Sequence, residues 1–331
     1  MTSQSRSVER TPRRAIVFGG GGVLGGTWAV GALSAWEQTT GLRAKDADIL
    51  VGTSAGSVLA SLVACGASTD ELIAHYQDEQ VTTGPLAGYQ WDPDRAAGGH
   101  KPGVPRLRGP GSPALIRSSL RHLGQLPATT VLSAFRPEGV RSPDRVGHLI
   151  DAVTPFGEWS SHQNLWVVAM DYTDGNRVVF GRSGAPVAPL SSAVMASCAI
   201  PGWFTPVDIG GRTYVDGGAV SATSVDVIAH SGLDEVYVIA PMVSFEMDSP
   251  SGIPARLERR WRAQVTKVCR DELALVRASG ARVYALGPGR EDLEAIGANL
   301  MDSSRRKLVL DTSLRTSAHA WRDEFAERLA G

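Results

Sequence analysis

The 331-residue chain carries 33 Lys and Arg against 34 Asp and Glu, so its net charge is close to zero and gives no electrostatic argument for nucleic-acid binding. A hydrophobic content of 43% is ordinary for a globular protein with a sizeable core. The cysteines are too few and too scattered for a disulfide framework or a metal site: Cys65, Cys198 and Cys269. They favour a reducing, cytoplasmic location. The polar residues 1–13 lack the apolar core of a secretory signal and are expected to form a disordered tail.

A buried-strand pattern at Ala15–Phe18 leads into a cluster of glycines and then into a helical stretch. Three of the glycines match G-x-G-x-x-G: Gly20, Gly22 and Gly25. In a dinucleotide-binding fold this loop holds a pyrophosphate, and Asp46 or Asp48 lies near the distance expected for a ribose ligand. In a serine hydrolase the same bare N–H groups would donate to an oxyanion.

The second strand pattern, Asp48–Val51, is followed directly by a G-x-S-x-G turn and an apolar helical run. Such a turn lifts a serine hydroxyl clear of a parallel sheet, and Gly52 and Gly56 allow it to close tightly. The helix N-terminus directs free N–H groups, including that of Ala55, toward the place where an oxyanion would form. Ser54 is therefore the predicted nucleophile, and because a nucleotide-binding fold needs no such turn, the hydrolase interpretation of the glycine cluster is favoured.

Residues 84–145 differ from the rest of the chain, because nine of its 19 prolines fall in this segment. Such a Pro/Gly-rich insertion predicts sparse regular structure. One interpretation is a lid over the acyl pocket, and the other is a surface excursion with a short helix near 112–123. A lid would place these apolar side chains against the pocket: Trp91, Leu107, Leu115, Ile116 and Leu120.

Strand-like runs alternate with helical patterns through the rest of the chain. They are Leu165–Met170, Val178–Phe180, Thr213–Val215, Glu235–Ala240 and Ala281–Ala285. This alternation predicts an α/β fold with a mainly parallel central sheet and helices on both faces, in one domain over residues 14–331. A long amphipathic helix is expected at Arg256–Ser279, and core packing is favoured over membrane contact for its apolar side chains: Leu257, Trp261, Val265, Val268, Leu275 and Val276.

Asp216 closes a short strand and is followed by Gly217 and Gly218. A carboxylate on a turn beside glycines can approach another loop closely, as a general base must. Asp-Gly is also a strong turn signal, so these residues alone leave both interpretations open.

Four stretches in order resemble the patatin-like phospholipase family: Gly20–Gly25, Gly52–Gly56, Ala196–Pro206 and Asp216–Gly218. The third is similar to the family's A-S-x-A-I-P-x-x-F-x-P segment. The resemblance implies a Ser-Asp dyad, with Ser54 as nucleophile and Asp216 as base. It further implies an oxyanion hole made by the N–H groups of the first glycine loop: Gly20, Gly21 and Gly22.

The implied protein is a lipid acyl hydrolase that needs no cofactor or metal and acts on a lipid or ester substrate, with transient contact to a membrane surface as a further expectation. An acyltransferase with the same dyad and a catalytically silent lipid-binding protein are the alternatives. Many relatives carry Arg or Lys at the position of Leu24, so a fixed positive charge near the site is expected to be missing here. The sequence gives no indication of the oligomeric state.

Histidines keep a second arrangement open, because a dyad needs none whereas a Ser-Asp-His triad would need one after Asp216. His230 and His319 both qualify by order, although structural roles are favoured for each. A dyad is also expected to stay active below about pH 6.5, where a histidine base becomes protonated.

Overall fold

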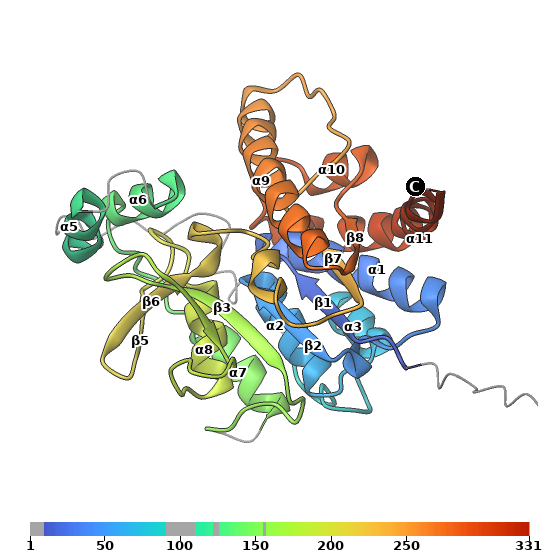
Figure 1. Cartoon of the computed structure of the whole chain (residues 1–331), viewed down its shortest axis with the longest axis horizontal. Coiled ribbons are helices and arrows are strands. Elements are labelled where there is room, and N and C mark those ends of the chain that lie inside the picture. Colours follow the sequence, from blue (N-terminus) through green and yellow to red (C-terminus); the bar gives the residue numbers. More distant parts are fainter. Residues whose placement is uncertain (1–9, 91–109, 122–125, 155–156, 331) are drawn as a thin grey trace, which may run out of the picture.

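The computed structural model describes residues 10–90, 110–121, 126–154 and 157–330. It contains a central sheet flanked by helices (Figure 1). The strands are β1 (Arg14–Phe18), β2 (Ile49–Thr53), β3 (Leu165–Asp171), β4 (Arg177–Phe180), β5 (Val207–Ile209), β6 (Arg212–Asp216), β7 (Glu235–Ile239) and β8 (Arg282–Leu286).

Helices connect most of the strands. The α-helices are α1 (Gly22–Thr40), α2 (Ala55–Ala64), α3 (Thr69–Tyr76), α5 (Pro113–Arg121), α6 (Ala128–Phe135), α7 (Asp144–Val153), α8 (Leu190–Cys198), α9 (Ile253–Ala278), α10 (Arg290–Ile296) and α11 (Arg306–Ala330). Short 3-10 turns are η1 (Ala44–Asp46), η2 (Gly217–Ala219), η3 (Val225–Ile228) and η4 (Ser303–Arg305).

The sheet is mainly parallel and has the order β5-β6-β3-β2-β1-β7-β8, with β4 paired to β3. Strands β3, β2, β1, β7 and β8 are parallel neighbours, whereas β4, β5 and β6 are joined by antiparallel pairing. The α/β fold class predicted from the sequence is therefore confirmed. Each predicted strand is present, and β5 is an addition whose three residues are too short for a clear periodic signal.

Alternate side chains of the strands enter two separate cores, as the pleat of a strand requires. Ile16 and Phe18 of β1 face the core shared with α1, α2, α8 and α11, whereas Ala15 and Val17 face the core shared with α9. Figure 1 shows α9 on one side of the sheet and α2 and α8 on the other. Helices therefore cover both faces, and the strand ends that carry the functional loops lie between two packed layers.

Helix α9 corrects one expectation. The helix exists over nearly the predicted range, but most of its apolar residues face outward: Ile253 is 80% exposed, Leu257 66%, Trp261 46%, Val268 44% and Leu275 57%. Its inward side carries charged residues, among them Arg259, Arg262 and Glu272, beside the buried apolar residues Cys269, Leu273 and Val276. Core packing was thus wrong for most of this set, although Val276 is buried. No described helix is both long and apolar enough to cross a membrane.

The predicted insertion is described only in part. Trp91 and Leu107 lie outside the described residues, as do residues 1–9 of the predicted tail. Helix α5 lies where a short helix was expected, and Leu115 is fully buried against Met170 and Val215. Figure 1 shows α5 and α6 near the β5–β6 end of the sheet. Whether the segment acts as a lid stays a prediction.

Candidate active site

The register of the sheet brings Ser54 and Asp216 together. Strand β2 runs parallel to β3 and ends with Thr53 opposite Val168. Strand β6 runs antiparallel to β3 and ends with Asp216 opposite Ala169, the next residue along. The two strands therefore end at adjacent positions of one neighbour, and the residues that leave them meet.

Ser197 fills the junction between these strand ends. Its hydroxyl accepts a hydrogen bond from the Ser54 N–H at 2.8 Å and donates one to the Val168 carbonyl at 2.6 Å. From the sequence alone, this serine was only part of the Ala196–Pro206 stretch and had no predicted role of its own. Its burial between a strand carbonyl and the turn shows that it fixes the backbone of the nucleophile candidate.

Ser54 sits on a strained turn, with φ 54° and ψ −128°, in the region that non-glycine residues rarely occupy. The turn closes only because Gly56 follows: a Cβ there would lie 2.1 Å from the Phe18 carbonyl oxygen. The strain is held by the surrounding bonds, including one of 2.7 Å from the Ser57 hydroxyl to the Ser54 carbonyl. The side chain is therefore presented at the start of α2, as expected of such a turn.

The Ser54 hydroxyl donates a 2.6 Å hydrogen bond to Oδ2 of Asp216, while the Gly218 N–H donates to Oδ1 at 2.7 Å. Both side chains are almost excluded from solvent, because Ser54 is 7% and Asp216 5% exposed. Burial raises the pKa of Asp216 from 3.8 to about 6, although the bonds from Ser54 and Gly218 act in the opposite direction. A carboxylate with this pKa is a far better proton acceptor than an exposed aspartate.

That pKa changes the expected acid tolerance. The pKa of Asp216 is about 6, so a dyad would lose activity on acidification near that pH. This is close to the ordinary histidine pKa of about 6.5. A pH profile therefore cannot separate a dyad from a triad in this protein, and substitution of the histidines is the discriminating measurement.

The glycine loop corrects one predicted oxyanion donor. The Gly20 N–H already donates to the Ala222 carbonyl at 2.8 Å, so it is not available to a substrate. In the described part of the chain, no acceptor lies within reach of the N–H groups of Gly21, Gly22 and Ala55. These three surround the start of α1 and α2, and Gly22 adopts φ +61°, which a side chain would strain.

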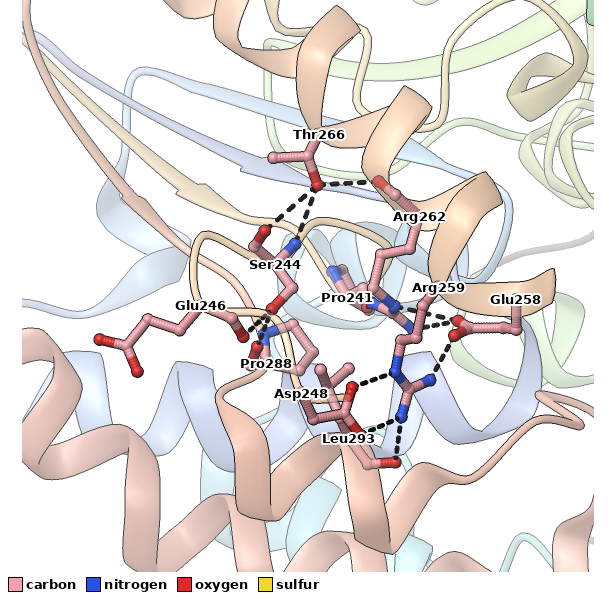
Figure 2. Close-up of polar contacts among 10 residues, drawn as sticks. All are labelled: Pro241, Ser244, Glu246, Asp248, Glu258, Arg259, Arg262, Thr266, Pro288 and Leu293. Carbon is pink, nitrogen blue, oxygen red and sulfur yellow. Dashed lines mark hydrogen bonds and ion pairs between the residues drawn. The ribbon is translucent and has the colours of Figure 1, made fainter. Parts of the chain in front are cut away.

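Helix α9 braces the glycine loop from behind. Pro241 packs on the loop so closely that a Cβ on Gly21 or Gly25 would lie 2.8 or 2.9 Å from the Pro241 Cβ. Fully buried Arg262 donates a 2.6 Å hydrogen bond to the Pro241 carbonyl and pairs with Glu258 at 2.8 Å (Figure 2). The inward charges of α9 thus hold the segment against which the glycine loop rests.

The same helix also fastens the chain that follows Asp216. Glu272 accepts hydrogen bonds of 2.5 Å from both Ser221 and Thr223, and one of 3.0 Å from the Val225 N–H. The carbonyl of Ala222, between two of these residues, is the acceptor for Gly20. Arg262 and Glu272 therefore have a clear role on the inward side of α9: they satisfy backbone and hydroxyl groups of the loops around the site.

A small pocket of about 80 Å³ opens beside Ser54. Its walls come from α1, α2, α3, α7, the end of α8 and the segment after it, the segment after α10, and the start of α11. They are mostly apolar: Gly22, Val23, Gly26, Ala55, Val58, Tyr76, Val146, Cys198, Ile200, Phe204, Met301 and Arg306. Arg306 corrects the expectation, drawn from Leu24, that the site has no fixed positive charge. The charge comes from a part of the chain that is distant in sequence.

The other candidates lie elsewhere. His230 and His319 are exposed, and neither is among the described residues that line the pocket. Asp46 and Asp48 precede β2, at the edge of the sheet opposite the glycine loop, and Asp48 accepts from the Arg14 N–H at 2.7 Å. A dinucleotide could not use them as ribose ligands while its pyrophosphate sat on that loop. They line a separate, open recess of about 550 Å³.

Groups suited to metal binding are not gathered at the site. Nowhere in the described ranges do three or more His, Cys, Asp or Glu side chains form a group that could hold a metal ion. Burial raises the pKa of the Cys198 thiol, with the nearby Asp216 carboxylate adding to the shift, so this pocket residue stays protonated at neutral pH.

Comparison with known proteins places this geometry in a family. The model of the family described as patatin-like phospholipase matches residues 16–228. YqhO, an uncharacterized protein of Bacillus subtilis, is 28% identical over 227 residues, which is 62% of this chain and 63% of the relative. The match thus spans less than two thirds of that relative's length.

Two solved structures are similar at a lower level. VipD from Legionella pneumophila has a TM-score of 0.38 and 14% identity over 92% of this chain and 68% of its own. The type III effector protein ExoU has a TM-score of 0.35 and 15% identity over 95% of this chain and 53% of its own. The family match itself covers more than half of the chain, including the glycine loop, the Ser54 turn and Asp216. The chain belongs to the patatin-like phospholipase family.

Proposed function

We propose that this protein is a serine acyl hydrolase that cleaves lipid or carboxylic esters through a Ser54–Asp216 dyad and an acyl-enzyme intermediate. The observation that carries the proposal is the 2.6 Å hydrogen bond from the Ser54 hydroxyl to a buried carboxylate whose pKa is raised to about 6. Membership of the family supports an ester bond as the target.

In this mechanism Ser54 Oγ attacks the ester carbonyl carbon while its proton passes to Asp216 Oδ2. The carbonyl oxygen becomes an oxyanion, which the unengaged N–H groups of Gly21, Gly22 and Ala55 stabilise. Asp216 then returns the proton to the departing alcohol. Water, deprotonated by Asp216, attacks the acyl-enzyme, and the acid leaves as Ser54 regains its proton.

The proposal is tested by labelling with a fluorophosphonate, which reacts with activated serines, and by hydrolysis of p-nitrophenyl esters of graded length beside intact phospholipids. Ser54→Ala should abolish labelling and turnover. Asp216→Asn should lose nearly all turnover, and the double variant should be little slower than either, because the two residues act as one unit. Failure of the wild-type protein to label would favour a silent lipid-binding protein, and ester products formed with added alcohols would favour an acyltransferase.

The ionisation of Asp216 sets the expected pH dependence. A general base must be deprotonated, so kcat/KM should be low below pH 5 and rise to a plateau above 7, with a midpoint near 6. A midpoint near 4, the value of an exposed aspartate, would contradict the role assigned to its burial.

We further propose that the outward face of α9 touches the lipid surface that supplies the substrate. Its exposed apolar residues recur at intervals of four or seven, from Ile253 to Leu275, and so form one stripe along the helix. Arg256, Arg260 and Lys267 are exposed beside this stripe, and Gln264 and Asp271 are exposed within it. An apolar stripe flanked by cations is the pattern of a helix that lies in an anionic membrane interface.

Vesicle flotation tests this contact. Leu257→Ser with Trp261→Ser should weaken binding to vesicles of mixed zwitterionic and anionic phospholipids at least about 10-fold, as the loss of two buried side chains implies. Leu132→Ser, at a residue 63% exposed on α6, is the matched control and should have no effect. Hydrolysis of a soluble ester should not change. A dimer in solution that the α9 substitutions dissociate would overturn the lipid contact.

A further inference from the structure

Arg306 is a buried cation in the pocket of the candidate nucleophile. It is the first residue of α11 and only 3% exposed. Of the described residues that line the pocket with Ser54, it is the one with a charged side chain. The other walls are mostly apolar, so its guanidinium faces little competition from neighbouring dipoles. The proposed catalytic steps make no use of this charge.

Its hydrogen bonding is incomplete. One terminal nitrogen, Nη2, pairs with Asp78, whose side chain is 44% exposed. The other two nitrogens, Nε and Nη1, are buried and find no acceptor among the described residues. Buried donors are almost always satisfied, and a buried guanidinium with unsatisfied N–H groups carries a desolvation cost. An acceptor supplied from outside the chain would remove that cost.

The groups that pack around Arg306 do not neutralise its charge. Burial, and then the charge of Arg306, lower the pKa of His75 to about 4, so that histidine is neutral at pH 7. Burial raises the pKa of Tyr76 to about 12, so its phenol also stays neutral. Asp78 is half in solvent, where its charge is screened. At pH 7 the site therefore holds two opposite charges, the Asp216 carboxylate bonded to Ser54 and the Arg306 guanidinium in the pocket wall.

We propose that Arg306 binds an oxyanion group, phosphate or carboxylate, that the substrate carries near the ester attacked by Ser54. This inference rests on the proposed function, because it names the class of ester. Arg306 and Ser54 line the same pocket of about 80 Å³, so an oxyanion held by Arg306 would lie near the ester that Ser54 attacks. Planar guanidinium groups suit phosphate and carboxylate oxygens, and the bonds are charge-assisted.

Binding is measured first, without turnover. The Ser54→Ala protein is titrated with hexyl phosphate and with hexanoate by calorimetry, and hexanol serves as the neutral analogue. Both anions should bind more tightly than hexanol, and the tighter of the two identifies the source of the charge. Adding Arg306→Gln should weaken the binding of both anions about 10- to 100-fold, the range for hydrogen bonds to a charged partner. Arg306→Lys should reduce their affinity less.

Two controls separate recognition from folding. Arg315→Gln removes an arginine of the same helix that is 62% exposed and should leave anion binding unchanged. Asp78→Asn removes the competing carboxylate and should tighten anion binding. Melting curves of each variant show whether it is folded. If Arg306→Gln fails to fold, Arg306→Lys, which keeps the positive charge, is measured in its place. Anion affinities that stay within about threefold in folded Arg306→Gln, or that weaken in Asp78→Asn, would overturn the inference.

Turnover separates this inference from the proposed function. The wild-type protein is given a 1-acylglycerol and the corresponding 1-acylglycerol phosphate of equal chain length. If both substrates are hydrolysed and Arg306→Gln does not change the ratio of their kcat/KM values, the anion site is rejected and the hydrolase proposal stands. Hydrolysis of neither, by protein that does not label with a fluorophosphonate, would reject the hydrolase, whatever the anions do in calorimetry.

Discussion

Replacing Asp216 by Asn should stabilise the fold while it removes activity. The pKa of Asp216 is raised from 3.8 to about 6, a difference of about two units, because the carboxylate is buried. At about 1.36 kcal/mol per unit this is about 3 kcal/mol of unfavourable ionisation in the native state at neutral pH. Asparagine has nearly the same shape, can accept from the Gly218 N–H as Asp216 does, and carries no charge.

The sign of the pH dependence follows from proton binding. Between pH 4 and 6 the native state of the wild-type protein holds the Asp216 proton and the unfolded state has released it, so stability falls as pH rises through this window. The loss is complete above pH 6 and absent below pH 4. Asp216→Asn lacks this ionisation, so its advantage should appear only as pH rises above 4.

Urea unfolding of both proteins from pH 4 to 8 measures the effect. At pH 7.5 the variant should be more stable by about 3 kcal/mol, with a melting temperature higher by several degrees, and the two should be alike near pH 4. The reasoning is refuted if Asp216→Asn is no more stable than the wild type at pH 7.5, or if its advantage is the same at pH 4.

Three further predictions address the rest of the site. His230→Gln or His319→Gln should keep most ester hydrolysis, because both side chains are exposed; a loss beyond about 100-fold, the scale of a missing general base, would restore a triad. Gly22→Ala should lower kcat on the order of 100-fold, with circular dichroism little changed, since it strains φ +61° beside two oxyanion donors; unchanged kcat would remove this loop from the oxyanion hole. Arg262→Met should lower stability by about 1–3 kcal/mol in urea unfolding, because the Pro241 carbonyl loses its donor and Glu258 keeps Arg259 but loses Arg262 as a partner. The same variant should lower kcat, and an unchanged kcat would show that the bond to Pro241 does not support the glycine loop.

The sheet and the nucleophile turn could be predicted from sequence because their signals are local. Buried parallel strands such as β1 are short apolar runs, and Gly52 and Gly56 are needed within a few residues of Ser54. Asp216 was harder, since an Asp-Gly pair is common in turns; only the resemblance of ordered motifs assigned it a role. Its meeting with Ser54 depends on where two strands end against β3, which no local pattern encodes.

The state of each group at the site also depends on contacts that are distant in sequence. The engagement of the Gly20 N–H depends on Ala222, and the raised pKa of Asp216 depends on burial by several elements. Likewise, Arg306 lies far from Ser54 in the sequence, yet both line one pocket. A glycine motif can therefore predict where an oxyanion hole forms, but not which of its N–H groups are unengaged.

Helix α9 shows why periodicity alone gave the wrong orientation. A repeat of apolar residues shows that a helix has two unlike faces, and the inward one is normally apolar because water is excluded from the core. Here the inward face must meet the Pro241 carbonyl and the hydroxyls of Ser221 and Thr223, so charged Arg262 and Glu272 are the better partners. The apolar face is then left outward, where its contact with water is unfavourable. Contact with a lipid surface would remove these side chains from water. The orientation of α9 thus allows its inward side to hold the loops of the candidate site while its outward side makes the proposed contact with the membrane.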